Sequence, residues 1–269
     1  MTKRQQIYYT TLVSVLAFLM LLSASVIWLE LQSRENDKDE FENLQNRIET
    51  MAPVKQEAET EQELLETETT VEISKEEMIP ETESLYVRNL TPLFEENSDC
   101  VGWINIPDTT VDYPVMHTPE EPEKYLRLNF YKEFSYSGVP FIDARCRLDS
   151  DNVFIYGHNM KNGTMFSDIM NYTIYEYCQD NPIIVLETTD GYREYTVCAV
   201  LYTDTTDSWF SFIDAENEDD FNNRIAFMKK ESLHDLGVTP EYGQSLITLS
   251  TCDNTDDSMR LLVIAVDIN

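Results

Sequence analysis

Cysteine, histidine and arginine are the residue types whose positions in this chain could carry out a reaction. Cys252 ends the apolar run "LITLST", and Arg260 opens the next apolar run, "RLLVIAVDI", after a short acidic segment. Strands joined by a short loop run antiparallel, so this pattern predicts that Arg260 faces Cys252 across a hairpin. A permanently charged guanidinium beside a thiol can hold the oxyanion that forms when sulfur attacks a carbonyl. Cys252 is therefore a candidate nucleophile, against the alternative of a buried strand-end thiol beside a surface arginine.

A nucleophilic cysteine also needs a group that exchanges protons with the reacting atoms, and the chain has three histidines. His158 directly follows the apolar stretch "NVFIYG", and Gly157 lets the backbone turn there so that the next side chain can point into a groove. His117 precedes the loop "TPEEPE", and His234 lies near the end of a predicted helix, positions more typical of structural or solvated histidines. His158 is the candidate acid and base, although only the fold could bring it near Cys252.

Composition excludes several other classes of function. The chain has 269 residues and a formal net charge of −31, without a basic stripe, which argues against binding to nucleic acid. The cysteines are five in number and have no CxxC spacing, so neither a disulfide framework nor a zinc site is expected. Cys178 and Cys198 lie in or beside apolar segments, which is typical of buried thiols. The acidic loops lack the alternating ligands of an EF-hand, so we expect no metal site.

The N-terminus predicts a membrane anchor. No charged side chain occurs between Arg4 and Glu30, a length that spans a bilayer as a helix, and aromatic residues lie near both ends of this stretch. Basic residues precede it and acidic residues follow, which places the N-terminus in the cytoplasm and the rest of the chain outside. The alternative is a cleaved signal peptide. We assign residues 1–31 to the cytoplasmic tip and transmembrane anchor.

Two further regions follow the anchor. Residues 32–84 are rich in Glu, Thr and Gln and predict an acidic, largely disordered stalk, because such a segment cannot bury enough apolar surface to offset its ordering entropy. Phe41, Leu44 and Ile48 within it have helical spacing, which is compatible with a short amphipathic helix near the membrane. Residues 85–269 have the length of one domain, and we assign them as the catalytic domain.

The pattern of this last region predicts a mainly β fold. Short runs rich in Val, Ile, Tyr and Phe recur between turn residues, which favours a closed barrel or a sandwich. Short helices are predicted at 120–128 and 164–177, and a longer one at 218–234 has Phe221, Ile225 and Met228 on one face. The eight strand candidates are "VGWINI", "VDYPV", "VPFID", "NVFIYG", "IIVLET", "EYTVCAVLY", "LITLST" and "RLLVIAVDI".

Several phrases of the sequence, in the same order, resemble the sortase family of Gram-positive surface transpeptidases. "VGWINIPDTTVDYPV" is similar to the family's opening strands, "NVFIYGHNMKNGTMFSDI" to its histidine segment, and "LITLSTCD" to the segment of its nucleophile. The wording "GHNMKNGTMF" and the long helix between the sixth and seventh strand candidates resemble class B. The resemblance implies an eight-stranded β-barrel that needs no cofactor.

The resemblance also implies roles for individual residues. Cys252 would attack the scissile carbonyl of a C-terminal sorting motif in a secreted protein and form a thioacyl intermediate. His158 would protonate the leaving amine and deprotonate the incoming one, a cell-wall amine from the peptidoglycan precursor, while Arg260 would orient the substrate and stabilise the oxyanion. Candidates for the substrate groove are Ser250 and, on weaker grounds, Thr251 and Asp253.

Three alternatives stay open at the level of sequence. A pilin-polymerising sortase would usually carry an N-terminal lid with an aromatic anchor, and no convincing lid motif is visible. A thiol peptidase would mainly hydrolyse its thioester, because the outcome depends on whether an amine or water reaches it first. A surface module could keep the sortase shape without catalysis, although the joint presence of His158, Cys252 and Arg260 argues against it.

Overall fold

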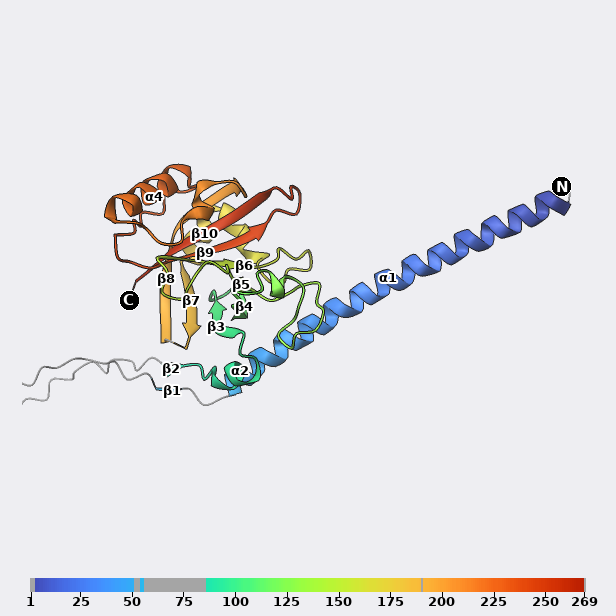
Figure 1. Ribbon diagram of the computed structural model, residues 1–269, viewed down its shortest axis with the longest axis horizontal. Helices are drawn as coiled ribbons and strands as arrows, with labels where there is room; N and C mark the ends of the chain where they lie inside the picture. The colour runs from blue at the N-terminus through green and yellow to red at the C-terminus, as the bar shows by residue number, and fades with distance from the viewer. Residues whose placement is uncertain (1–2, 51–53, 56–85, 190, 269) are drawn as a thin grey trace, which may run out of the picture.

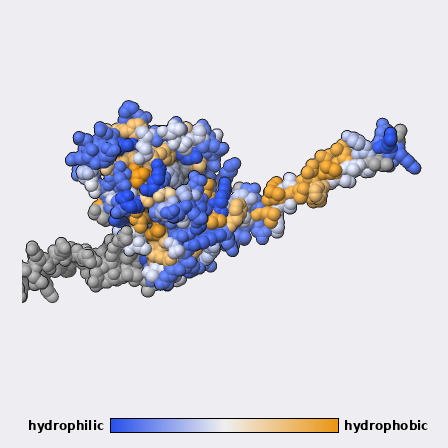
Figure 2. Space-filling view, viewed as in Figure 1, coloured by the Kyte–Doolittle hydropathy of each residue, from blue (hydrophilic) through white to orange (hydrophobic). Residues whose placement is uncertain are grey.

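A long N-terminal helix and a barrel are the two main parts of the computed structural model, which describes residues 3–50, 54–55, 86–189 and 191–268. Helix α1 (Lys3–Thr50) projects away from the barrel (Figure 1), and behind its hydrophilic tip it carries a mostly apolar stretch (Figure 2). Among the described residues it is the one helix long and apolar enough to cross a membrane. The anchor predicted from the sequence is therefore present as a candidate membrane span.

The barrel contains all eight strand candidates. Its strands close in the order β10-β8-β7-β3-β4-β5-β6-β9, so the prediction of an eight-stranded barrel is confirmed for the described residues. A separate pair, β1 (Val54–Lys55) and β2 (Tyr86–Val87), is antiparallel. The barrel strands are β3 (Cys100–Asn105), β4 (Asp112–Met116), β5 (Phe141–Ile142), β6 (Asn152–Tyr156), β7 (Ile183–Thr188), β8 (Gly191–Asp204), β9 (Leu246–Cys252) and β10 (Met259–Asp267).

The strands form where β-branched and aromatic residues follow one another, and strands β9 and β10 are buried on both faces. All six residues from Leu261 to Val266 of β10 are buried. Such a continuous apolar run is expected for a strand whose second face is covered by other elements rather than by water. That cover includes the η2 turn (Asp168–Thr173), which contacts β10, and helix α4 (Glu218–Glu231), which packs on the neighbouring β8.

The long helix predicted from the sequence is present, and a side-chain cap marks its start. Helix α4 lies between β8 and β9, the sixth and seventh barrel strands, as predicted. The Asn217 side chain caps it by accepting a hydrogen bond from the amide of Asp220, and its buried face is Phe221, Ile225 and Met228. The other helical elements are α2 (Thr91–Glu96), α3 (Tyr175–Asp180), and the 3₁₀ turns η1 (Lys124–Leu126) and η3 (Ser208–Ser211).

Two of the predicted helices are shorter than expected. The range 120–128 keeps only η1, because Glu123 has a positive φ of 63° and cannot continue a right-handed helix. The range 164–177 begins as the 3₁₀ turn η2, and the extended backbone of Ile174 separates it from α3. The first range is therefore reduced to a single 3₁₀ turn, and the second is divided into a 3₁₀ turn and the start of a short α-helix.

The C-terminal part of α1 differs from the solvated stalk predicted for residues 32–84. Residues 32–50 continue the helix, and Phe41, Leu44 and Ile48 are buried against the barrel. The physical reason is their spacing, which places three apolar side chains on one helical face that then packs on the ring of Tyr113 and its neighbours. Residues 51–53 and 56–84 of that range lie outside the described residues, and the domain boundaries stay a prediction.

Candidate active site

Two strand pairings bring the candidate residues to one end of the barrel. β6 runs parallel to β9 with Tyr156 opposite Ser250, so His158 and Cys252, each two residues further on, leave the sheet at the same end. β9 and β10 are antiparallel, and Arg260 is the register partner of Cys252. Opposed residues of an antiparallel pair lie on the same face with Cβ atoms about 5 Å apart. The contact across a hairpin that the sequence predicted is therefore present.

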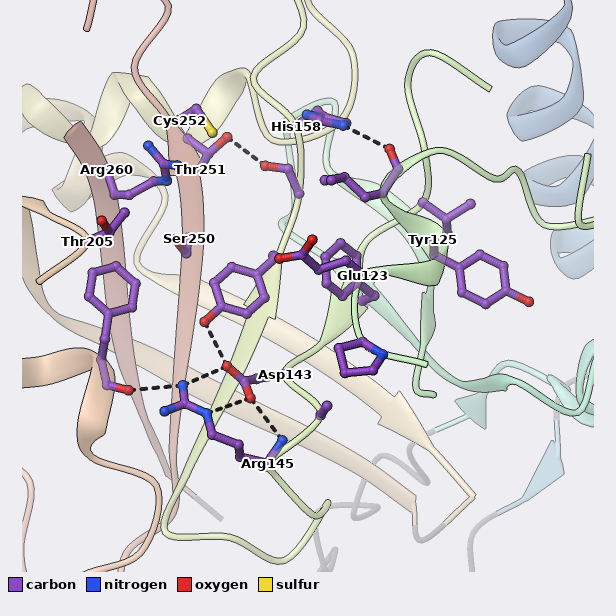
Figure 3. Close-up of a pocket in the computed structure, with 18 of the residues that line it drawn as sticks. Glu123, Tyr125, Asp143, Arg145, His158, Thr205, Ser250, Thr251, Cys252 and Arg260 are labelled. Atoms are coloured by element: carbon purple, nitrogen blue, oxygen red, sulfur yellow. Dashed lines mark hydrogen bonds and ion pairs between the residues drawn. The ribbon is translucent and has the colours of Figure 1, made fainter. Parts of the chain in front are cut away.

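A cavity of about 730 Å³ opens at this end of the barrel. His158, Cys252 and Arg260 all line it, together with Ser250 and Thr251 of β9 (Figure 3). Its volume is in the range of about 300 to 1,000 Å³ that is typical of ligand sites. The other lining residues are Pro122, Glu123, Tyr125, Leu126, Ser137, Val139, Phe141, Asp143, Ala144, Arg145, Tyr156, Gly157, Thr205 and Phe210.

The thiol of Cys252 differs from the other four in its surroundings. It is half-buried at the cavity, whereas the other four are buried. Burial raises the pKa of Cys100 and Cys198 to about 12 and the pKa of Cys146 and Cys178 to about 11. Because the thiolate is the reactive form, these four are expected to be inert.

The imidazole of His158 is oriented by a backbone group. Its Nε2 lies 3.0 Å from the carbonyl oxygen of Leu126. A carbonyl can only accept, so Nε2 carries the hydrogen, and Nδ1 is the nitrogen left to exchange protons. Burial lowers the pKa of His158, the hydrogen bond to Leu126 opposes this, and the charge of Arg127 adds to it. Among the described residues no hydrogen bond joins His158 to Cys252, although both face the same cavity (Figure 3).

The guanidinium of Arg260 is fixed by the turn between β9 and β10. Its Nη1 donates to the carbonyl oxygens of Asp257, at 2.7 Å, and Met259, at 2.8 Å. Arginine has donors on three nitrogens in a rigid plane, so Nε and Nη2 stay available to an oxygen in the cavity. The turn therefore holds a charged donor group beside the thiol.

The three substrate-groove candidates have different positions. Ser250 lines the cavity, and its buried hydroxyl has no hydrogen-bond partner in the described structure, so it is available to a ligand. Thr251 also lines the cavity, but its hydroxyl donates to the carbonyl oxygen of Gly157 at 2.7 Å and so links β9 to the histidine segment.

Asp253 lies apart from the cavity lining, which differs from its expected place in the groove. Its carboxylate accepts hydrogen bonds from the hydroxyl groups of Thr255, at 2.6 Å, and Tyr202, at 2.7 Å. These bonds lower the pKa of Asp253 to about 2. The carboxylate is thus drawn to the turn and to β8, and it shapes the loop rather than the cavity.

Some residues of the site had no assignment from the sequence. The side-chain amide of Asn159 donates to the carbonyl oxygen of Cys252 at 3.0 Å and joins the segment of His158 to that of Cys252. Further along the cavity, Nε and Nη2 of Arg145 bind both carboxylate oxygens of Asp143, and the hydroxyl of Tyr156 donates to the same carboxylate at 2.8 Å (Figure 3). An acid at the end of the strand candidate "VPFID" and an arginine two residues later could have indicated this pair.

The remaining histidines lie away from the cavity lining. Nε2 of His234 lies 3.0 Å from the carbonyl oxygen of Thr173, and the ring packs edge-on against Tyr175. His117 is half-buried near Asp143 and Cys146. No group of three or more His, Cys, Asp or Glu side chains suited to a metal ion occurs in the part of the chain that the structure describes.

Comparison with known proteins agrees with this geometry. The family model of the sortase domain matches residues 104–268. The chain is 33% identical over 170 residues to sortase B of Listeria monocytogenes, covering 62% of this chain and 68% of that protein. The structure of a Staphylococcus aureus sortase B–substrate complex superposes with a TM-score of 0.63 at 28% identity, over 67% of this chain and 84% of the other. Sortase B from B. anthracis in complex with AAEK1 shares the fold, with a TM-score of 0.70 at 22% identity over 89% and 99%.

Proposed function

The chain belongs to the sortase family, and we propose that it is a membrane-anchored, class B-like sortase in which Cys252, His158 and Arg260 carry out the transfer. Members of this family are cysteine transpeptidases. The proposed substrates are secreted proteins with a C-terminal sorting motif, and the proposed acceptor is an amine of the peptidoglycan precursor. The likeness to class B proteins in sequence and fold supports this assignment.

The proposed reaction has two acyl-transfer steps. His158 takes the thiol proton through Nδ1, Sγ of Cys252 attacks the scissile carbonyl carbon, and the C–N bond breaks as the imidazolium protonates the leaving amine. The acceptor amine then attacks the thioester, its proton passes to His158, and the C–S bond breaks to release the thiol. The pKa of His158, lowered by burial, favours the neutral imidazole that can take a proton.

Arg260 acts on the oxyanion of both tetrahedral intermediates. Its free Nε and Nη2 groups share the face of the sheet on which Cys252 lies. A donor that is fixed before the reaction needs no reorganisation when charge develops, which is why such groups contribute strongly to acyl transfer. The pairing of Arg260 with Cys252, at the end of the barrel where His158 also faces the cavity, is the single observation that carries the proposal.

The test uses the full chain in detergent micelles and a library of sorting-motif peptides, with and without a small amine acceptor. We expect Cys252→Ala to abolish cleavage without unfolding the protein, and Cys178→Ala, which removes a thiol far from the cavity, to retain it. Cleavage by Cys252→Ala would rule out the proposed mechanism. An acid product that no amine diverts into an amide would identify a hydrolytic thiol peptidase instead.

The remaining part of the proposal concerns location. Residues 1–31 are proposed as the cytoplasmic tip and membrane anchor, with the barrel outside the cell. The large apolar side chains of α1 between Tyr8 and Leu31 are exposed, which is costly in water and favourable in a bilayer. An enzyme that acts on a lipid-linked acceptor would need this placement.

A further inference from the structure

One wall of the cavity is a loop with almost no regular structure. The segment 122–139 is part of the connection between β4 and β5, and besides an isolated bridge between Leu128 and Phe134 it contains only the short turn η1. Tyr125, Leu126, Ser137 and Val139 of this loop line the cavity opposite the thiol. The same loop supplies the Leu126 carbonyl that bonds Nε2 of His158. The position of this loop therefore decides where the imidazole points.

The two ends of the loop are pressed together where Leu126 lies. Gly138 has a positive φ of 59°, and a Cβ atom there would lie 2.5 Å from the carbonyl oxygen of Tyr125 and 2.8 Å from that of Leu126. The next residue, Val139, donates its amide to Tyr125 at 3.0 Å. Any shift of residues 135–138 is consequently transmitted to the carbonyl that holds His158.

Residues 135–138 are in turn held by helix α1. The hydroxyl of Ser135 accepts from the amides of Ser137 and Gly138, both at 3.0 Å, and donates to the carboxylate of Asp37 at 2.8 Å. The amide of Ser137 also lies 3.4 Å from this carboxylate. Asp37 is only 4% exposed. A buried carboxylate whose partners are a hydroxyl and an amide makes strong, charge-assisted hydrogen bonds.

Other contacts keep this part of α1 in place. The carboxylate of Glu40 accepts from the side-chain amide of Asn129, at 2.5 Å, and from the backbone amide of Phe130, at 3.1 Å. One turn further on, Gln45 donates to the carbonyl oxygen of Asp112 at 2.8 Å. A helix that only attached the barrel to a membrane would need none of these contacts. They place Asp37 reproducibly against the loop.

We propose that Asp37 is a positioning residue for the transfer reaction: it holds residues 135–138, which hold the Leu126 carbonyl, which fixes the tautomer and orientation of His158. The hydrogen bond on one ring nitrogen decides which nitrogen carries the proton, so a displaced carbonyl would affect proton transfer at the other. This inference rests on the proposed catalytic role of His158. It makes the anchoring helix a working part of the active site.

The test compares Asp37→Ala and Asp37→Asn with wild type, in the full chain in detergent. Because small misplacements of a catalytic group can cost about 100-fold in rate, we expect kcat/KM to fall at least about 10-fold in Asp37→Ala, mostly in kcat. The matched control is Glu42→Ala, since Glu42 is an exposed acid of the same helix that pairs with Lys38 at 3.6 Å. This control should keep wild-type kcat/KM.

Two readouts separate positioning from mere stability. In a protein with three histidines, imidazole nitrogen resonances can be assigned by single variants, and in Asp37→Ala the pKa of His158 should move up toward its ordinary value as burial is relieved, while those of His117 and His234 stay unchanged. Ser135→Ala removes the same link from the other side. In a double-mutant cycle the two substitutions should be strongly non-additive.

The outcomes are distinguishable. Any one of four results would overturn the role of Asp37. Two concern Asp37→Ala directly: a wild-type kcat/KM, or an unchanged titration of His158. The other two are additive effects with Ser135→Ala and a loss of activity that only follows the unfolded fraction. None of these touches the role of Cys252. Conversely, activity in His158→Ala would overturn the proposed function, and with it the reason for positioning the imidazole.

Discussion

At the scale of single residues, the surroundings of the proposed nucleophile Cys252 differ from those of the four buried thiols. Cys252 lies at a strand end beside a fixed arginine, whereas Cys198 is buried and its Sγ lies 3.4 Å from the carbonyl oxygen of Ile264 in β10. Exposure and a neighbouring cation are the two conditions that favour a reactive thiol, and burial disfavours one. Arg260 illustrates the same point, because the turn that fixes its Nη1 leaves its other donors facing the cavity.

The first prediction concerns this arginine. We expect Arg260→Lys to lower kcat for peptide cleavage by about 100-fold, the usual cost of losing one oxyanion donor, because an ammonium cannot bind the turn carbonyls and the oxyanion in one plane. Steady-state kinetics with the preferred peptide measure the effect. The thermal midpoint should change little, because Arg260 is partly exposed. If Arg260→Lys had the wild-type kcat, a positive charge alone would be enough to stabilise the oxyanion, and the planar guanidinium would not be needed.

The sequence predicted some of these residues and could not predict others. Cys252 and Arg260 follow from a hairpin, which is a local pattern, whereas His158 entered through its strand-end position and the resemblance. The sequence could not predict that the Leu126 carbonyl binds His158, because every residue has a carbonyl and only the fold determines which one lies beside the imidazole. Asp253 stays a prediction for the groove, since adjacency to Cys252 could not show that the turn draws its carboxylate toward Thr255.

At the scale of elements, the strands were predictable and their pairing was not. All eight apolar runs are barrel strands, because each combines β-branched residues with flanking turn residues. The parallel pairing of β6 with β9, which brings His158 near Cys252, joins segments far apart in the chain. Local periodicity contains no information on such a contact. Likewise, Phe41, Leu44 and Ile48 predicted a helix, but the surface that buries it belongs to the barrel.

The second prediction concerns the docking of α1. Burial, with smaller contributions from the charges of Asp37 and Glu133, raises the pKa of Glu40 to about 7, and the hydrogen bonds from Phe130 and Asn129 only partly oppose this. The folded-state pKa lies above the ordinary value of 4.5. The folded protein therefore binds this proton more tightly than the unfolded chain does, and the stability from Glu40 is lost as pH rises from about 4.5 to about 7.

The substitution Glu40→Gln tests the predicted pH dependence of stability, because glutamine does not titrate but still has an oxygen that can accept a hydrogen bond from the amide of Phe130. The thermal midpoints of the variant and the wild-type full chain should be close near pH 4.5, and the variant should become relatively more stable as pH approaches 7.5. Taking the difference between the two proteins removes the background pH dependence. Glu42→Gln, on the exposed face of the same helix, serves as control. A flat difference for Glu40→Gln would contradict the shifted pKa.

At the scale of the whole molecule, one continuous helix contains both the candidate membrane span and the face that packs on the barrel. The uncharged part of α1 ends before Glu30, and Asp37 follows seven residues later, about 10 Å along a helix that rises 1.5 Å per residue. The barrel is docked on the same continuous helix (Figure 1). If the first part of α1 is embedded in lipid, the barrel stands close to the bilayer surface, within reach of lipid-linked acceptors.

The last prediction concerns sidedness, and the cysteines make it measurable. All five lie between residues 100 and 252, and four are buried, so a membrane-impermeant maleimide reports on Cys252 alone. In intact cells whose wall has been removed, we expect one label per chain in the membrane fraction, with no increase after permeabilisation and none in Cys252→Ser. Labelling only after permeabilisation would place the barrel in the cytoplasm and contradict the proposed topology. Labelled protein in the medium would instead identify the N-terminal segment as a cleaved signal peptide. The remaining part of α1 would then not be anchored in a membrane.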